Sequence, residues 1–255
     1  MMIDAHLHLA QYPRTKLKDE IERWRENGIK AVIAVADDLA SSYETLELQQ
    51  AFPHFVYACV GFHPERPIPS KRDVEEWKAL IKHERERITA IGEIGLPHYE
   101  LERLSLSLEE ATARFYEYID VAKSYDLPVA LHAVHDKATI ALQALLEKGV
   151  KHAHFHWLKA DERSVELIVQ AGYYISVTPE ICYRRRDEQL AKRVPLSRLL
   201  IETDGPWRFD GEFKNEETTP LFLKHVIEKI AEIKNLSTED VRRQVYENTR
   251  RCYHI

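Results

Sequence analysis

Short runs of apolar residues recur along the chain and predict buried strands. Each run is rich in β-branched or other apolar side chains and lacks the alternation of a strand with one face in water, which is typical of parallel strands buried on both faces. The eight predicted strands are Ile3–His8, Ala31–Ala36, Phe55–Gly61, Ile88–Ile94, Pro128–Val134, Ala153–Trp157, Tyr173–Val177 and Leu199–Glu202. The pattern therefore predicts a parallel sheet.

Stretches with a helical period lie between the predicted strands. The clearest begins at Ser107, where Glu110 completes a capping box ahead of repeating apolar residues. The other predicted helices start near Thr15 and stop at Gly28, start near Ser41 or Ser70, and cover Asp161–Ala171, Phe222–Ile233 and Ser237–Glu247. Strand and helix alternate over eight units and no GxGxxG turn follows the first strand. We therefore expect an α/β fold of the (β/α)₈ type, a TIM barrel, instead of an open doubly wound sheet.

Length and composition fit one such barrel. The chain has 255 residues, 44% of them hydrophobic, and no linker or repeat divides it, so we expect a single domain over residues 1–255. Its apolar stretches are too short to cross a bilayer, and Asp4 and His6 interrupt any secretory signal after Met1. The three cysteines are odd in number and widely spaced, which indicates a reducing compartment, and a net charge of -6 argues against nonspecific nucleic-acid binding over the whole surface. We expect a cytoplasmic monomer that does not bind membranes.

Histidines and carboxylates end most of the predicted strands. His6 and His8 point the same way because strand side chains alternate, so they either share a metal ion or form a hydrogen-bonded pair in the barrel. Glu93 lies among small and apolar residues, where a buried carboxylate needs a cation or several donors. The remaining strand-end residues of this kind are His132, His156 and Asp204. Six such residues on the rim where barrel enzymes hold their sites predict a metal centre.

An ordered set of short motifs runs the length of the chain. The motifs are Asp4-Ala5-His6-Leu7-His8, Gly61-Phe62-His63-Pro64, Gly92-Glu93-Ile94-Gly95-Leu96, Leu127-Pro128 leading to His132, then His156, and Glu202-Thr203-Asp204-Gly205-Pro206. The set resembles the TatD family of metal-dependent hydrolases, which have an amidohydrolase-type barrel. The resemblance implies that His6, His8 and Asp204 hold one divalent ion. It also implies that His132 and His156 hold a second ion, that Glu93 bridges the two, and that Asp204 takes the proton of a shared water.

Several residues keep two interpretations. His154 faces the same side as His156 and is the alternative sixth-strand ligand, although its earlier place favours a structural role. His63 either donates to a substrate phosphate or is a capped loop histidine. Lys159 and Arg184–Arg186 form either an anion pocket or a solvated helix face. Asp4 and Glu202 either orient the ligand imidazoles or pack in the barrel.

The chain departs from the family at positions that contact substrate. The family commonly has an aspartate where this chain has Pro97, an arginine where it has Val134, and Ser-Gly where it has Lys159-Ala160. We therefore expect a hydrolase with two divalent ions, and phosphodiester hydrolysis of DNA ends as a 3′–5′ exonuclease or other deoxyribonuclease is the leading function. Hydrolysis of another ester, a lactone, an amide or a D-aminoacyl-tRNA ester is the alternative, and an idle-site scaffold protein is a third. The ligand set suits Zn²⁺, Mn²⁺, Ni²⁺ or Fe²⁺, and Mg²⁺ less well.

Overall fold

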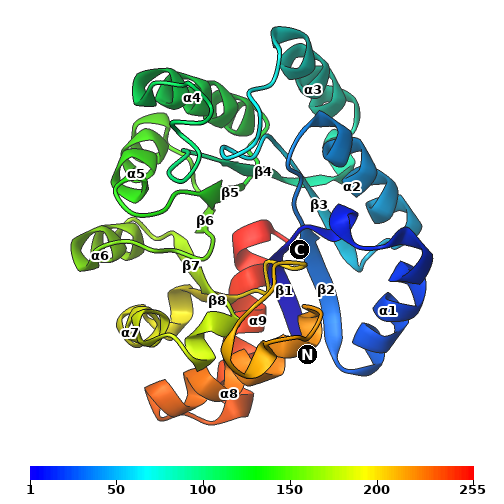
Figure 1. Ribbon diagram of the computed structural model, residues 1–255, viewed down its shortest axis with the longest axis vertical. Coiled ribbons are helices and arrows are strands. Elements are labelled where there is room, and N and C mark those ends of the chain that lie inside the picture. The colour runs from blue at the N-terminus through cyan, green and yellow to red at the C-terminus, as the bar shows by residue number, and fades with distance from the viewer.

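A ring of eight parallel strands forms the centre of the computed structural model, which describes residues 1–255. The strands are β1 Met2–Leu7, β2 Ile29–Ala34, β3 Val56–Val60, β4 Ile88–Gly95, β5 Val129–His132, β6 Ala153–Phe155, β7 Tyr174–Val177 and β8 Leu199–Ile201. Each strand pairs with the next along the chain, in the order β1 to β8. The predicted (β/α)₈ barrel is confirmed, and all eight predicted strands are present (Figure 1).

The chain after β8 returns to the end of β1. The backbone N–H of Asp204 donates to the carbonyl of His6 at 3.0 Å, and that of His8 donates to the carbonyl of Gly205 at 2.7 Å. These bonds nearly close the barrel at the carboxyl ends of its strands. They also bring Asp204 next to His6 and His8, although almost the whole chain separates them in sequence.

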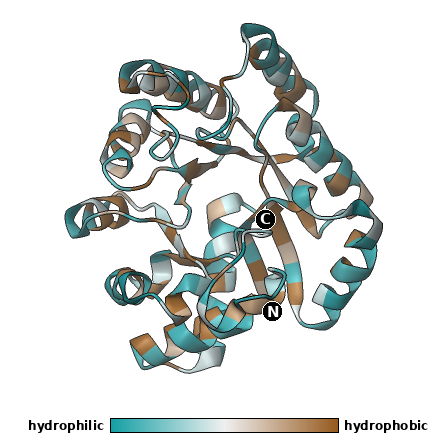
Figure 2. Ribbon diagram, viewed as in Figure 1, coloured by the Kyte–Doolittle hydropathy of each residue, from teal (hydrophilic) through white to brown (hydrophobic).

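Helices cover the outside of the ring (Figure 1). They are α1 Arg14–Glu26, α2 Leu39–Ala51, α3 Lys71–His83, α4 Leu108–Ser124, α5 Lys137–Lys148, α6 Glu162–Gln170, α7 Arg185–Arg193 and α8 Leu223–Lys234, whereas α9 Thr238–Tyr253 lies across one end of the ring. Figure 2 shows hydrophilic residues along much of their outer surface and hydrophobic residues along the strands. None of these helices is both long and apolar enough to pass through a membrane.

Capping residues explain where several helices begin. The side chain of Ser107 accepts from the N–H of Glu110 at 3.1 Å, and the carboxylate of Glu110 accepts from the N–H of Ser107 at 2.9 Å, so the predicted capping box starts α4. The helix expected near Ser41 begins earlier, because Asp38 is its N-cap and accepts from the N–H of Ser41 at 2.8 Å. Two helices that the periodicity did not delimit, α5 and α7, complete the alternation.

The last helix closes the end of the barrel away from the strand carboxyl ends. α9 runs on to Tyr253 and does not stop at the predicted Glu247. Cys252 and Tyr253 pack against inward-facing apolar residues of the strands, including Ala130 and Leu200. Side chains alternate along a strand, so His132 and Glu202, two residues further along, face the same interior at the opposite end. The barrel therefore has an apolar floor and a polar mouth.

Candidate metal centre

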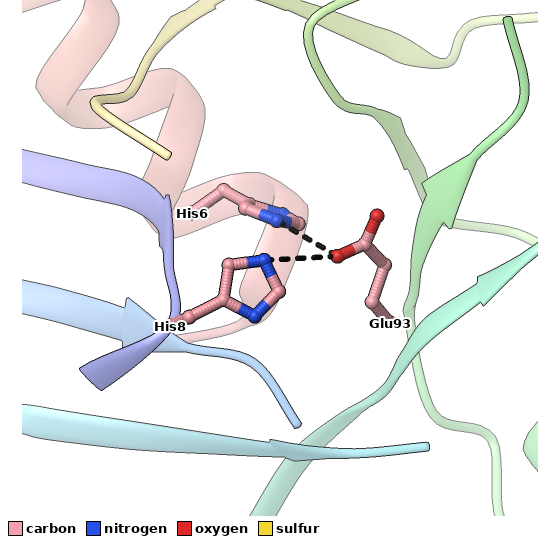
Figure 3. A group of neighbouring side chains, drawn as sticks. All are labelled: His6, His8 and Glu93. Atoms are coloured by element: carbon pink, nitrogen blue, oxygen red, sulfur yellow. Dashed lines mark ion pairs between the residues drawn. The ribbon is translucent and has the colours of Figure 1, made fainter. Parts of the chain in front are cut away.

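The six predicted ligands meet at the mouth of the barrel, and one oxygen of Glu93 faces the ligands from β1. Glu93 Oε2 lies 3.2 Å from His6 Nε2 and 3.4 Å from His8 Nε2 (Figure 3). Asp204 Oδ1 lies 3.5 Å from the same nitrogen of His6 and 3.4 Å from that of His8. Two imidazole nitrogens and two carboxylate oxygens therefore surround one point.

The second oxygen of Glu93 faces a different pair of imidazoles. Glu93 Oε1 lies 3.1 Å from Nδ1 of His132 and 2.9 Å from Nε2 of His156. Those two nitrogens are 3.2 Å apart. One carboxylate thus stands between two groups of nitrogen donors, with one of its oxygens directed at each.

Glycines let the backbone around Glu93 approach the neighbouring strands. A Cβ on Gly61, directly after β3, would lie 2.7 Å from the carbonyl carbon of Gly92, and a Cβ on Gly95 would overlap the carbonyl of His132. The register between β4 and β5 also shifts between Ile91 and Ile94. The small residues that flank Glu93 in the sequence therefore serve close strand packing, which places the carboxylate at the centre of the mouth.

The donor atoms fit a divalent cation. His6 Nε2, Glu93 Oε2 and Asp204 Oδ1 are buried and have no hydrogen-bond partner in the protein, an arrangement that costs free energy unless a cation satisfies them. Burial alone raises the pKa of the Glu93 carboxyl, but the imidazoles of His63, His156 and His6 outweigh burial and hold the pKa well below its ordinary value. The carboxylate is therefore ionised, and imidazole nitrogen with carboxylate oxygen is a donor set for Zn²⁺, Mn²⁺, Ni²⁺ or Fe²⁺.

A chain of contacts from the barrel floor orients His156 rather than His154 toward Glu93. The hydroxyl of Tyr253 lies 2.7 Å from His154 Nδ1, and His154 Nε2 lies 3.3 Å from Glu202 Oε2. Glu202 Oε1 accepts the N–H of Trp157 at 2.9 Å and lies 3.3 Å from His156 Nδ1. The structure thus places His154 between Tyr253 and Glu202, and it leaves Nε2 of His156 free to face Glu93.

Of the two interpretations of Asp4, the structure agrees with packing inside the barrel. Its carboxylate accepts hydrogen bonds from the N–H and the hydroxyl of Thr203, at 3.1 and 2.5 Å. Burial raises the pKa of Asp4 to about 8, and the bonds to Thr203 only partly offset this effect. Asp4 therefore fixes the backbone next to Asp204 and does not orient a ligand imidazole.

Two carboxylates that the sequence did not reveal contact the outer nitrogens of ligand imidazoles. Asp37, after β2, lies 3.3 Å from Nδ1 of His8. Glu65, after β3, lies 3.4 Å from Nε2 of His132. Burial alone raises the pKa of Glu65, but His132 and three backbone N–H groups lower it to about 2. Asp37 directly follows the predicted strand Ala31–Ala36, so the strand-end pattern was a signal for it, whereas Glu65 lies in a loop without such a signal.

A cavity of about 620 Å³ opens over these ligands. Its walls come from loops that follow several different strands. They include His8, His63, Glu65, Arg66, Tyr99, His132, Val134, His156, Trp157, Lys159, Asp204 and Trp207. The position agrees with the general placement of barrel active sites at the carboxyl ends of the strands.

The three predicted substrate contacts have different positions. His63 and Lys159 line the cavity, whereas Arg184 lies outside its walls and has Glu180 and Asp210 at 3.6 and 3.8 Å. The Nδ1 of His63 accepts the N–H of Glu65 at 3.1 Å, so the proton of the neutral ring is on Nε2, which lies 3.3 Å from Glu93 Oε1. His63 therefore presents a donor at the floor of the cavity.

Comparisons with known proteins identify the family of this chain. A family model described as TatD related DNase matches residues 3–254. A protein of Haemophilus influenzae named an uncharacterized metal-dependent hydrolase is 35% identical over 256 residues, with 100% of both chains covered. The 3′-5′ ssDNA/RNA exonuclease TatD of Erwinia tasmaniensis is 26% identical over 270 residues, again with 100% of both chains covered. The crystal structure of YJJV, a TatD homologue from Escherichia coli, superposes with a TM-score of 0.87 at 23% identity and covers 100% of this chain and 98% of that chain. The chain therefore belongs to the TatD family of metal-dependent hydrolases, enzymes that act on ester bonds.

Proposed function

We propose that this protein hydrolyses phosphodiester bonds at the ends of DNA strands and uses two divalent ions. The observation that carries the proposal is Glu93, whose two oxygens face separate groups of imidazoles at the floor of one cavity. A relative named an exonuclease and a family model described as a DNase support the choice of a phosphodiester. The unpaired cation of Lys159 in the cavity wall also suits an anionic substrate.

The two oxygens of Glu93 face different imidazoles, and we divide the ligands between two ions accordingly. His6, His8 and Asp204 would hold one ion and His132 and His156 the other, while Glu93 contributes one oxygen to each. When bound, such a pair of cations lowers the pKa of a shared water and neutralises charge that develops on a phosphoryl group. The protein supplies a buried, preformed site in which both effects are strong.

Side chains of the chain itself handle protons and orient the substrate. Asp204 lines the cavity and its Oδ1 has no hydrogen-bond partner in the protein, so we assign to Asp204 the role of accepting the proton of the attacking water. The Nε2–H group of His63 faces the site, where it would donate a hydrogen bond to a phosphoryl oxygen. Lys159 attracts the phosphate from the wall.

Hydrolysis of a neutral ester, a lactone or an amide is the second candidate. Val134 lines the cavity at a position where the family commonly has an arginine, so this part of the wall is apolar and uncharged. A neutral substrate would need no cation there. The same ligands and the same proton acceptor would serve both reactions.

Substrate comparison tests the proposed function. We expect metal-loaded protein to shorten single-stranded or frayed DNA slowly with Mg²⁺ or Mn²⁺, and to lose this activity on addition of a chelator. Turnover is slow because the arginine common at the Val134 position is absent. The measurement is product length on a gel against hydrolysis of simple esters and lactones by the same preparation. Intact DNA together with rapid lactone hydrolysis would replace the leading function by the second.

Asp37 and Glu65 allow a paired test of the two-ion arrangement. Each touches the outer nitrogen of a ligand imidazole, and loss of such a contact typically lowers metal affinity by about 10–100-fold. We expect Asp37→Asn to weaken the ion held by His8 and Glu65→Gln to weaken the ion held by His132. Titration with Zn²⁺ against a coloured chelator measures both affinities.

A variant that keeps only one metal site shows which ion each substitution affects. In His132→Ala, the second ion is lost, so Asp37→Asn should still weaken the remaining ion while Glu65→Gln should not. Equal effects of the two substitutions in this background would contradict a division of the ligands into two groups.

A further inference from the structure

Two exposed aromatic side chains stand on the rim of the cavity. Trp207 and Tyr99 expose 58% and 55% of their surface, although few large apolar side chains of the chain are exposed at all. Both line the cavity over the metal ligands. Exposed aromatic rings beside a polar site commonly mark a surface that a ligand covers.

Backbone hydrogen bonds tie both aromatic residues to the metal centre. The N–H of Trp207 donates to the carbonyl of Asp204 at 3.0 Å. The N–H of Tyr99 donates at 3.0 Å to the carboxylate of Glu65, which also touches His132. The ring of Trp207 packs edge to face on the buried Trp157, with ring centroids 5.7 Å apart. The backbone of both residues and the ring of Trp207 are therefore held in place, which lowers the ordering cost when a ligand binds.

A cation without an ion-pair partner lies in the same cavity wall, over the rings of Trp157 and Tyr99. The Nζ of Lys159 is 4.1 Å from the ring centroid of Trp157 and 5.7 Å from that of Tyr99. The arginines nearby differ, because Arg184 and Arg186 both pair with Glu180. The ammonium of Lys159 therefore lies over aromatic faces without a carboxylate partner and remains available to an anion from solvent.

We infer that Tyr99, Lys159 and Trp207 form a nucleotide subsite, in which the base next to the reacting phosphodiester stacks on the aromatic rings and its phosphate binds Lys159. The inference rests on the proposed function and adds a requirement for an unpaired base. A base inside a duplex has both faces covered by its neighbours, whereas a single-stranded or frayed end exposes a face for stacking. A small lactone or amide would use neither the cation nor both rings.

Matched oligonucleotides test the subsite. One single strand carries a normal base at its terminal nucleotides and the other carries abasic nucleotides there. Stacking on an aromatic side chain predicts that the native protein has a KM lower by roughly tenfold for the strand with bases. Trp207→Leu should raise that KM to the abasic value, and Trp207→Phe, which keeps a ring, should retain most of the preference. Tyr43→Leu, at an exposed tyrosine of α2 outside the cavity, is the control and should leave the preference unchanged.

Tryptophan fluorescence separates the subsite from the reaction. Trp24 and Trp77 are buried and do not line the cavity, and Trp157 in its wall is only 7% exposed, so quenching by added deoxyadenosine monophosphate should come mainly from Trp207 and be lost in Trp207→Leu. Deoxyribose 5-phosphate, which has no base, should quench little. If DNA remains intact but quenching occurs, the proposed function fails and the subsite stands. If DNA is cut but strands with and without bases react equally, or if no quenching occurs, the subsite is wrong.

Discussion

The variant Glu93→Gln is expected to bind less than one divalent ion per chain where the native protein binds about two, and to lose turnover by roughly 10³-fold or more. The amide keeps one weak oxygen ligand but replaces the other oxygen by an N–H₂ group directed at one of the two imidazole groups. It also removes the negative charge at the centre of His6, His8, His132 and His156. Elemental analysis after dialysis gives the stoichiometry, and thermal unfolding shows whether the variant is folded.

A carboxylate on the rim provides the control for Glu93→Gln. Asp136 is exposed, follows β5 and does not line the cavity, so Asp136→Asn changes the same charge without touching a ligand. It should keep both ions and most of the turnover. Two ions retained in Glu93→Gln would mean that Glu93 does not bridge them, and the division of the ligands into two groups would have to be abandoned.

The fold could be predicted from the sequence because the signals for it are local. Apolar runs mark the strands, and pairs such as Ser107 and Glu110 mark helix starts within a few residues of each other. The signal for the ligand positions is also local, because residues at the carboxyl ends of the strands in a parallel barrel must meet at its mouth. Once the barrel is predicted, the place of a residue along its strand is therefore enough to locate it at the mouth.

Contacts between distant residues could not be predicted in the same way. The alternation of side chains along β6 places His154 and His156 on the same face. Their roles differ because Tyr253 of the last helix occupies the space beside His154. Arg184 stands in a run of positive charge, but Glu180 and Asp210 lie next to its guanidinium. Glu65 reaches His132 only through the path of a loop. Each case depends on which side chain a remote segment brings near, and the local pattern does not carry this information.

Asp204→Asn should reduce turnover by roughly 10²–10⁴-fold while at least the second ion stays bound. The asparagine keeps the shape of the side chain and one weak oxygen ligand near His6 and His8, but its amide cannot accept the proton of the attacking water. The backbone bond from Asp204 to His6 is unaffected, so the barrel closure should persist.

His132→Ala is the matched variant that separates proton transfer from metal binding. It removes a ligand of the second ion and leaves Asp204 intact, so metal content should fall by about one ion per chain while the proton acceptor remains. Metal content and turnover are measured side by side: Asp204→Asn should lose turnover while the second ion stays bound, whereas His132→Ala should lose that ion. Near-native turnover in Asp204→Asn would show that another group accepts the proton, because the carboxylate would then be dispensable even with both ions in place.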